Sequence, residues 1–351
     1  MTNSGRVSAT VEREARALGF HLAGITRVPE PGGCDEFAEL EAFPQWIAEG
    51  RGGAMEYLQR QDAEGKYLRS SLRTPFPWAR SVIVCAVNYN TAQPYSMDPA
   101  PKGAGWIARY AWSGVGNKTG NVAGKDESVA LEPTDYHTVM RDKLEQLSQK
   151  LQTEVGAFTA RCFVDTGPLV ERVYAKYAGL GWQGKNTCLL NEKLGSWFFL
   201  GVIVTSLELT REDWTAPMAD RCGSCTRCID ACPTQCLEAY RMDASRCIAY
   251  LTIEKRGEIP AELQPAIGRN VFGCDICQEV CPWNGKAPIT DWPELTARPE
   301  LVNPALEWLE NLDEQAYRRL FRKSPISRTK YAGLQRNVAI ARSNQSTGDG
   351  K

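Results

Sequence analysis

The chain has 351 residues, of which 43% are hydrophobic and 24% are charged, and its net charge is -1. This composition is typical of a protein with a large buried core, and the length predicts two or three domains. The absence of an apolar run of about 18 residues excludes a membrane-spanning helix. The balanced charge excludes a general attraction to nucleic acid, and with only two histidines a multi-histidine metal site is excluded as well.

The first 215 residues alternate between helical and strand patterns. Apolar residues recur at helical spacing in residues 11–18 and 140–151. Runs typical of buried strands occupy residues 81–88, 158–165 and 196–209. This alternation favours a layered α/β (α+β) domain.

Three further segments follow this domain. We expect domain boundaries at 1–215 for the α/β part, 216–292 for a cysteine-rich module and 293–345 for a helical C-terminal segment, with a disordered tail at 346–351. Within the first domain, residues 113–134 are rich in Gly, Ser, Asn and charge. That composition predicts a mobile loop or lid.

Eight of the 13 cysteines form a dense pattern, Cys222-x2-Cys225-x2-Cys228-x3-Cys232-Pro233, then Cys247, then Cys274-x2-Cys277-x3-Cys281-Pro282. In C-x2-C-x2-C-x3-C-P runs the first three cysteines hold one 4Fe-4S cluster and the fourth ligates the other cluster. Paired C-x2-C units also build zinc sites, but such sites rarely need this longer run. The sequence therefore predicts two 4Fe-4S clusters and single-electron transfer.

The crossing rule assigns most of the ligands. The first three cysteines of the run need a distant fourth thiolate, and Cys281, followed by proline, mirrors Cys232. The second cluster then uses Cys232, Cys274 and Cys277 with either Cys236 or Cys247, a choice that spacing leaves open. We favour Cys247, because Cys236 would lie one helical turn from Cys232.

Asp165 ends a predicted strand immediately before a helix. Active-site groups often occupy this place in α/β folds, but an aspartate there also serves as a helix N-cap. His137 lies in DYHTVM, which resembles a segment that donates an axial histidine to cobalamin, yet Met140 stands where that segment has glycine. We therefore expect a structural role for His137.

A basic strip lies near the C-terminus. Between Arg318 and Ser343 there is no acidic residue, and the strip contains Arg318, Arg319, Arg322, Lys323, Arg328, Lys330, Arg336 and Arg342. Such a strip attracts a phosphate backbone, and the alternative interpretation is a solvated helix face.

Several motifs together resemble the epoxyqueuosine reductase family. They are CGSCTRCIDACPTQ at 222, CIAYLTIEKRGEIP at 247, IGRNVFGCDICQEVCPWN at 267, VDTGPLVERVYAKYAGLGWQGKN at 164, GSWFFLG at 195, ARYAW at 108, DYH at 135 and LQRNVAIA at 334. The resemblance implies a cobalamin-dependent enzyme that reduces epoxyqueuosine to queuosine at the wobble position of tRNA, the last step of queuosine biosynthesis. It also implies a cobalamin-binding α/β (α+β) domain, a ferredoxin-like two-cluster module and a C-terminal helical segment.

The resemblance assigns roles to individual residues. One cluster takes Cys222, Cys225, Cys228 and Cys281, and the other takes Cys232, Cys247, Cys274 and Cys277. Asp165 becomes the proton donor beside cobalamin, and we expect burial there to raise its pKa. The implied cobalamin contacts are Arg69, Ala108, Asp165, Asn186, Leu189, Leu200 and Ala249. The implied tRNA contacts are Lys255, Arg328, Lys330 and Arg336.

The sequence departs from the family pattern in three places. The Gly-rich insertion separates Trp112 from Asp135, which a family member has nearly adjacent. Ala249 stands where a serine is common, and the spacer between Cys232 and Cys247 is one residue short. The insertion bears on the lid over the cofactor, and Ala249 removes one possible hydrogen bond.

The implied cofactors and partners follow. We expect two 4Fe-4S clusters and base-off cobalamin without a protein axial histidine, a tRNA anticodon stem-loop as substrate, and an external electron donor such as a flavodoxin or ferredoxin. The N-terminus has neither an apolar signal region nor a twin arginine, so a cytoplasmic location without a membrane partner is expected. We also expect a monomer. The alternatives are a corrinoid-dependent reductive dehalogenase-like enzyme and a simple electron carrier.

Overall fold

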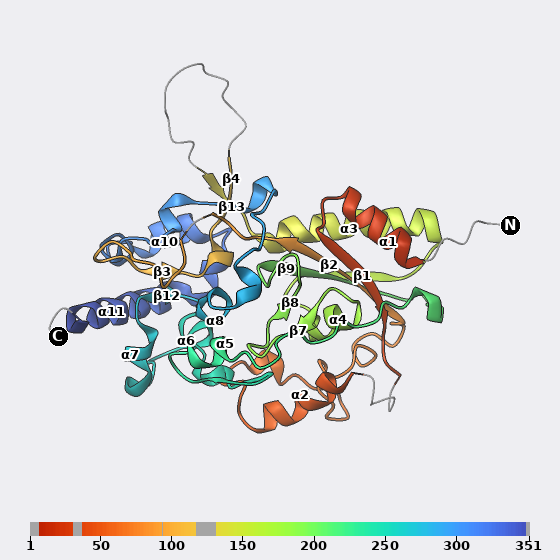
Figure 1. The fold of residues 1–351 in the computed structure, drawn as a ribbon, viewed down its shortest axis with the longest axis horizontal. Helices are drawn as coiled ribbons and strands as arrows, with labels where there is room; N and C mark the ends of the chain where they lie inside the picture. Colours follow the sequence, from red (N-terminus) through yellow and green to blue (C-terminus); the bar gives the residue numbers. More distant parts are fainter. Residues whose placement is uncertain (1–6, 31–36, 93, 117–130, 349–351) are drawn as a thin grey trace, which may run out of the picture. The chain divides into compact units, whose positions relative to one another are not determined.

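A computed structural model describes residues 7–30, 37–92, 94–116 and 131–348 of the chain (Figure 1). The chain forms two compact units. Unit 1 comprises residues 1–88, 137–226 and 238–242, and unit 2 comprises residues 89–136, 227–237 and 243–351. This grouping differs from the expected domains, because β3 (Trp106–Ile107) pairs with β12 (Asn270–Phe272) and so joins the middle of the chain to the cysteine-rich and C-terminal segments.

Unit 1 is built on a four-stranded sheet. Its order is β1 (Leu22–Arg27), β2 (Ser81–Asn88), β9 (Phe198–Thr205) and β6 (Ala160–Phe163). Neighbouring strands in it pair antiparallel. Of the classes named from the sequence, the antiparallel pairing fits α+β.

Helices cover both faces of this sheet (Figure 1). On one face lie α1 (Val7–Ala17) and α3 (Tyr136–Val155), and α4 (Glu171–Tyr177) lies on the other. The helix α3 packs so closely on β9 that a Cβ at Gly201 would lie 2.8 Å from Leu144. On the α4 face, alternate residues of β2 and β9 such as Val84 and Val202 form a core with Tyr174.

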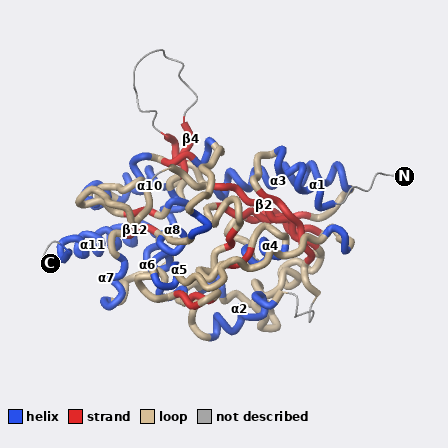
Figure 2. Tube along the Cα trace, viewed as in Figure 1, coloured by secondary structure: helices blue, strands red, loops and turns tan. Residues whose placement is uncertain are grey.

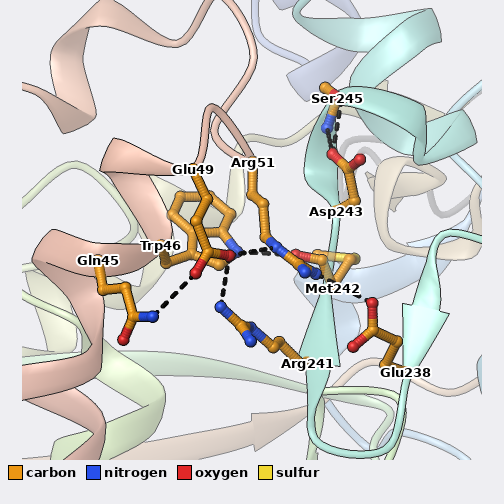
Figure 3. A network of polar contacts seen from close by, with 9 residues as sticks. All are labelled: Gln45, Trp46, Glu49, Arg51, Glu238, Arg241, Met242, Asp243 and Ser245. Carbon is orange, nitrogen blue, oxygen red and sulfur yellow. Dashed lines mark hydrogen bonds and ion pairs between the residues drawn. The ribbon is translucent and has the colours of Figure 1, made fainter.

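A polar network anchors the segment between two of the predicted cluster cysteines (Figure 3). This segment is a hairpin of β10 (Leu237–Glu238) and β11 (Arg241–Met242). The Trp46 indole of α2 (Ala38–Ala48) donates to the Met242 carbonyl at 2.7 Å, the Glu49 carboxylate pairs with Arg241, and Arg51 pairs with Glu238 at 3.3 Å. Three points of attachment therefore fix the hairpin that leads from Cys236 to Cys247.

Unit 2 is mainly helical, with small sheets (Figure 2). Its core surrounds Trp106, Phe272, Leu309 and Phe321. The small sheets pair β3 with β12, and β4 (Ser113–Gly116) with β5 (Leu131–Pro133) and β13 (Thr296–Ala297). The helices are α5 (Arg227–Asp230), α6 (Ile248–Ile253), α7 (Gln264–Ile267), α8 (Ile276–Glu279), α9 (Leu306–Glu310), α10 (Glu314–Phe321) and α11 (Lys330–Gly348).

The predicted elements mostly coincide with the observed ones, and two expectations at the edges differ. The tail expected to be disordered from residue 346 begins inside α11, which runs to Gly348 because Asn344 and Gln345 bind backbone carbonyls. The predicted lid at 113–134 begins and ends as strands, and residues 117–130 lie outside the described part. Within the described residues, no helix has the length and apolarity needed to cross a bilayer.

Candidate functional site

Asp165 occupies a tight turn directly after β6. Its φ angle is 58°, and the Thr166 amide donates to the Val164 carbonyl at 2.7 Å. A hydrogen bond between residues two apart, with a central residue at positive φ, defines a strained γ-type turn. The side chain of Asp165 is 68% exposed, so the protein holds it outward.

Protein atoms alone do not bury this carboxylate, so the burial expected beside cobalamin stays a prediction. The aspartate also does not act as the N-cap of α4, because that helix begins at Glu171 with Val170 at its cap and no side-chain cap.

His137, expected to be structural, is the neighbour of this carboxylate. Its Nε2 lies 3.6 Å from Asp165 Oδ2, and its own side chain is 24% exposed. The imidazole comes from the first turn of α3, and the carboxylate from the end of β6. The fold therefore brings together two ionisable side chains whose separation in the sequence did not suggest that they are neighbours.

Glu171, the first residue of α4, lies beneath the turn. Its Oε1 accepts a hydrogen bond from the Asp165 backbone amide at 2.8 Å. Desolvation of the carboxyl and the nearby charge of Asp165 raise the pKa of Glu171 to about 8, against the opposing effects of the amide, Arg69 and Arg172. Glu171 is thus the carboxylic acid that stays protonated at neutral pH in this site, and sequence analysis did not identify it.

The predicted cofactor residues of unit 1 are positioned by backbone contacts and by the core. Arg69 donates to the Leu169 carbonyl at 2.6 Å, which connects it to the Asp165 turn. Asn186 is buried and accepts from the Cys188 amide at 3.1 Å. Leu189 in β8 (Leu189–Leu190), which pairs with β7 (Trp182–Gln183), and Leu200 in β9 both pack on the core that contains Tyr174.

Two predicted cofactor residues belong to unit 2. Ala108 is buried, and Gly273 approaches it so closely that a Cβ on Gly273 would lie 2.5 Å from the Ala108 Cβ. Ala249 lies on α6, two residues after Cys247. Both alanines are therefore adjacent to predicted cluster ligands, since Gly273 immediately precedes Cys274.

Three cysteines of unit 2 lie in contact. The Sγ atoms of Cys232 and Cys236 are 3.5 Å apart, and Cys236, which is 5% exposed, also hydrogen-bonds to Cys247. Each ligand of a 4Fe-4S cube binds a different iron, so the ligand sulfurs of one cube lie well apart. Cys232 and Cys247 both contact Cys236, and their assignment as cluster ligands stays a prediction.

The remaining predicted ligands are placed by short elements. In unit 1, the Cys222 amide donates to Asp220 at 2.8 Å, and Lys185 Nζ donates to the Gly223 carbonyl at 2.6 Å. In unit 2, α5, which carries Cys228, contacts α8, which carries Cys277. None of the described cysteines forms a disulfide, and thiolates are the donors that iron-sulfur clusters take.

Comparison with known proteins identifies the family to which the chain belongs. The family described as epoxyqueuosine reductase QueG (DUF1730) matches residues 69–166, and a 4Fe-4S double cluster binding domain matches residues 221–284. An epoxyqueuosine reductase from Xanthomonas campestris is 38% identical over 96% of this chain and 86% of its own length. One from Cellulophaga algicola is 34% identical over 96% of this chain and 99% of its own. The chain belongs to the epoxyqueuosine reductase family.

Solved structures agree with this membership. A selenomethionine-labelled epoxyqueuosine reductase superposes with a TM-score of 0.80 at 25% identity, covering 97% of this chain and 82% of the other. Another epoxyqueuosine reductase, solved with an epoxyqueuosine-modified tRNA-Tyr stem loop, gives a TM-score of 0.79 at 26% identity with the same coverage. The double-cluster match includes the eight predicted ligands, and the other match includes Arg69, Ala108 and Asp165.

In this family member the basic strip is partly engaged within the protein. Arg336 donates to the carbonyls of Leu251, Lys255 and Gly257. Arg328 pairs with Glu254 at 2.9 Å. Lys330 is exposed at the start of α11, and Lys255 is partly exposed at the end of α6. The four predicted tRNA contacts therefore gather at one place in unit 2, but the guanidinium of Arg336 is occupied by backbone carbonyls.

Proposed function

We propose that this protein reduces epoxyqueuosine to queuosine at the wobble position of tRNA anticodons. The observation that carries the proposal is the outward-held Asp165, on a strained turn inside the region that matches the family. Membership of the family supports it, as does the related reductase solved with an epoxyqueuosine-modified stem loop.

The reaction needs a proton donor, and Asp165 is well placed for that role. Reduction of an epoxide to an alkene takes up two electrons and two protons and releases the oxygen as water. Asp165 would deliver a proton to the departing oxygen, and His137, 3.6 Å away, would return a proton to it. Exposure of the Asp165 side chain gives a bulky tRNA nucleotide access to the acid.

Electrons would come through two 4Fe-4S clusters. The proposed ligands are Cys222, Cys225, Cys228 and Cys281 for one cluster, and Cys232, Cys247, Cys274 and Cys277 for the other. The match of the double-cluster domain to residues 221–284 supports this set, and none of the described cysteines forms a disulfide. A flavodoxin or ferredoxin would load the clusters one electron at a time.

Cobalamin is the second proposed cofactor, and when bound it supplies a strongly reducing cobalt centre. The residues that would hold it are Arg69, Ala108, Asp165, Asn186, Leu189, Leu200 and Ala249, a mixture of polar and small apolar groups that suits an amphipathic macrocycle. Both histidines have neighbours within unit 1, because His137 lies 3.6 Å from Asp165 and His21 accepts from the Asn88 amide, and this supports a cobalamin without a protein imidazole. A base-off state without a protein imidazole is therefore proposed.

The tRNA anticodon stem-loop would contact unit 2 near Lys255, Arg328 and Lys330. Arg336 would support this surface from within by fixing the backbone around Lys255. We further propose that the protein acts as a monomer in the cytoplasm.

The decisive experiment is turnover of epoxyqueuosine-containing tRNA by the reconstituted protein with cobalamin and a chemical reductant. We expect queuosine to form, and Asp165→Asn to lower kcat by about 100-fold or more while tRNA affinity stays within about twofold. Absence of queuosine with protein that holds both clusters and cobalamin would refute the function. Turnover of an aryl halide without binding of the stem-loop would instead indicate the dehalogenase-like alternative.

A further inference from the structure

The backbone conformation of Asp165 is costly and must be maintained by its surroundings. A residue other than glycine in the left-handed region of a γ-type turn stores about 1–3 kcal/mol. Such a conformation persists only where other groups hold it in place. Contacts around the turn must therefore keep Asp165 at its φ of 58°.

Three contacts hold the turn. Directly after it, Gly167 packs so closely on Leu169 that a Cβ on Gly167 would lie 2.3 Å from the Leu169 side chain. Behind it, Arg69 fixes the Leu169 carbonyl at 2.6 Å. At the strained residue itself, the Asp165 amide donates to Glu171 Oε1 at 2.8 Å. Of these contacts, only the one from Glu171 reaches the backbone of Asp165.

The geometry points to a role for Glu171. We propose that Glu171 is the positioning residue of the Asp165 turn: its side-chain oxygen fixes the Asp165 amide and thereby aims the Asp165 carboxyl at the substrate. This inference rests on the proposed function, in which Asp165 donates a proton. The contact is made by side-chain oxygen, so the proposal requires an acceptor atom and not a negative charge.

Protonation makes glutamine the matched substitute. Desolvation and the charge of Asp165 keep the Glu171 carboxyl neutral below about pH 8, with Arg69 and Arg172 acting in the opposite direction. A neutral carboxyl and a carboxamide have the same shape and both present an oxygen acceptor. Methionine fills a similar volume without a comparable acceptor. Glu171→Gln and Glu171→Met therefore separate the hydrogen bond from packing.

A control comes from Glu39 of α2, a carboxylate that contacts the same helix, α4. Glu39 accepts from Tyr177 at 3.1 Å and pairs with Lys176, both on α4, but it has no contact with the Asp165 turn among the described residues. Glu39→Gln thus perturbs α4 without touching the Asp165 amide. Its kcat is expected to stay within about twofold of the wild-type value.

The test combines kinetics with hydrogen exchange on reconstituted holoprotein. We expect Glu171→Met to lower kcat by about 10- to 100-fold with little change in KM. The Asp165 carboxyl would be wrongly oriented toward the substrate, whereas tRNA binding would be kept. Glu171→Gln should stay within about threefold of wild type. The peptide that covers residues 164–170 should exchange faster in Glu171→Met and at the wild-type rate in Glu171→Gln.

Two results would overturn the proposal. One is a Glu171→Met variant with wild-type kcat and wild-type exchange of the turn. The other is a Glu171→Gln variant as impaired as Glu171→Met, since charge and not the acceptor would then matter. If the wild-type protein itself produced no queuosine, the proposed function would fail. The exchange data would still decide whether Glu171 holds the turn.

Discussion

Glu171 should make the stability of the protein depend on pH in a direction opposite to that of most carboxylates. Its pKa is raised from 4.5 to about 8 in the folded protein, first by desolvation and then by the charge of Asp165. Between these two pH values the unfolded chain has lost the proton that the folded chain retains. The contribution of Glu171 to the free energy of unfolding is therefore fully present below about pH 4.5. It is lost as the pH rises to about 8.

The size of the effect follows from the width of this window. A shift of one pKa unit corresponds to about 1.4 kcal/mol, so the full shift would be worth roughly 5 kcal/mol. Glu171 as a residue is not fully buried, and water screens part of this cost. We therefore expect Glu171→Gln, which cannot ionise, to gain about 2–4 kcal/mol relative to wild type between pH 5 and pH 8.5.

The assay is thermal unfolding of holoprotein at a fixed scan rate over this pH range, because a two-unit protein with clusters need not unfold in a single reversible step. Glu39→Gln is the control, because the pKa of Glu39 is shifted in the opposite direction from that of Glu171. Burial raises the pKa of Glu39, but the Lys176 hydrogen bond and the other contacts hold it below its usual value overall. Its variant should be destabilised at neutral pH and recover in acid. A constant difference between Glu171→Gln and wild type from pH 5 to pH 8.5 would refute the reasoning.

Other predictions test the clusters, the core and the tRNA surface. Cys236→Ala should keep about eight irons per chain and Cys247→Ala should lose about half of them, as measured by iron analysis and electron paramagnetic resonance; the reverse result would make Cys236 the ligand. Asn337→Ala should lower the free energy of unfolding by about 2–4 kcal/mol, because its buried amide donates to two backbone carbonyls, and denaturant unfolding of unit 2 would show this. Lys330→Ala should weaken stem-loop binding a few-fold and reduce the salt dependence by about one ion, whereas an unchanged salt slope would remove Lys330 from the interface.

Local patterns in the sequence predicted the elements that depend on local physics. Residues 81–88 were expected to form a buried strand and form β2 with the same bounds, because an unbroken apolar run suits a strand covered on both faces. The helical stripe from Met140 to Leu151 lies within α3. The antiparallel order of the sheet was not predictable in this way, since strand pairing depends on contacts between distant segments.

The role of the basic strip could not be predicted from its charge alone. A run of basic residues can bind phosphates at the surface, or its side chains can pair with other groups of the same protein. The structure engages Arg336 with carbonyls of the 251–257 segment, and Arg328 with Glu254. Both partners lie more than 70 positions earlier in the chain, so no inspection of residues 318–343 would have found them.

The sequence by itself determined the cluster chemistry, because thiolate spacing within a short run is a local property, and it marked Asp165 at the end of a strand. Tertiary structure decided how that aspartate is used. It brings His137 from α3 to the carboxylate and sets Glu171 under the strained amide, and it places Cys236 against Cys232. These relations depend on how the chain packs around a sheet and a turn, and no spacing along the sequence encodes them.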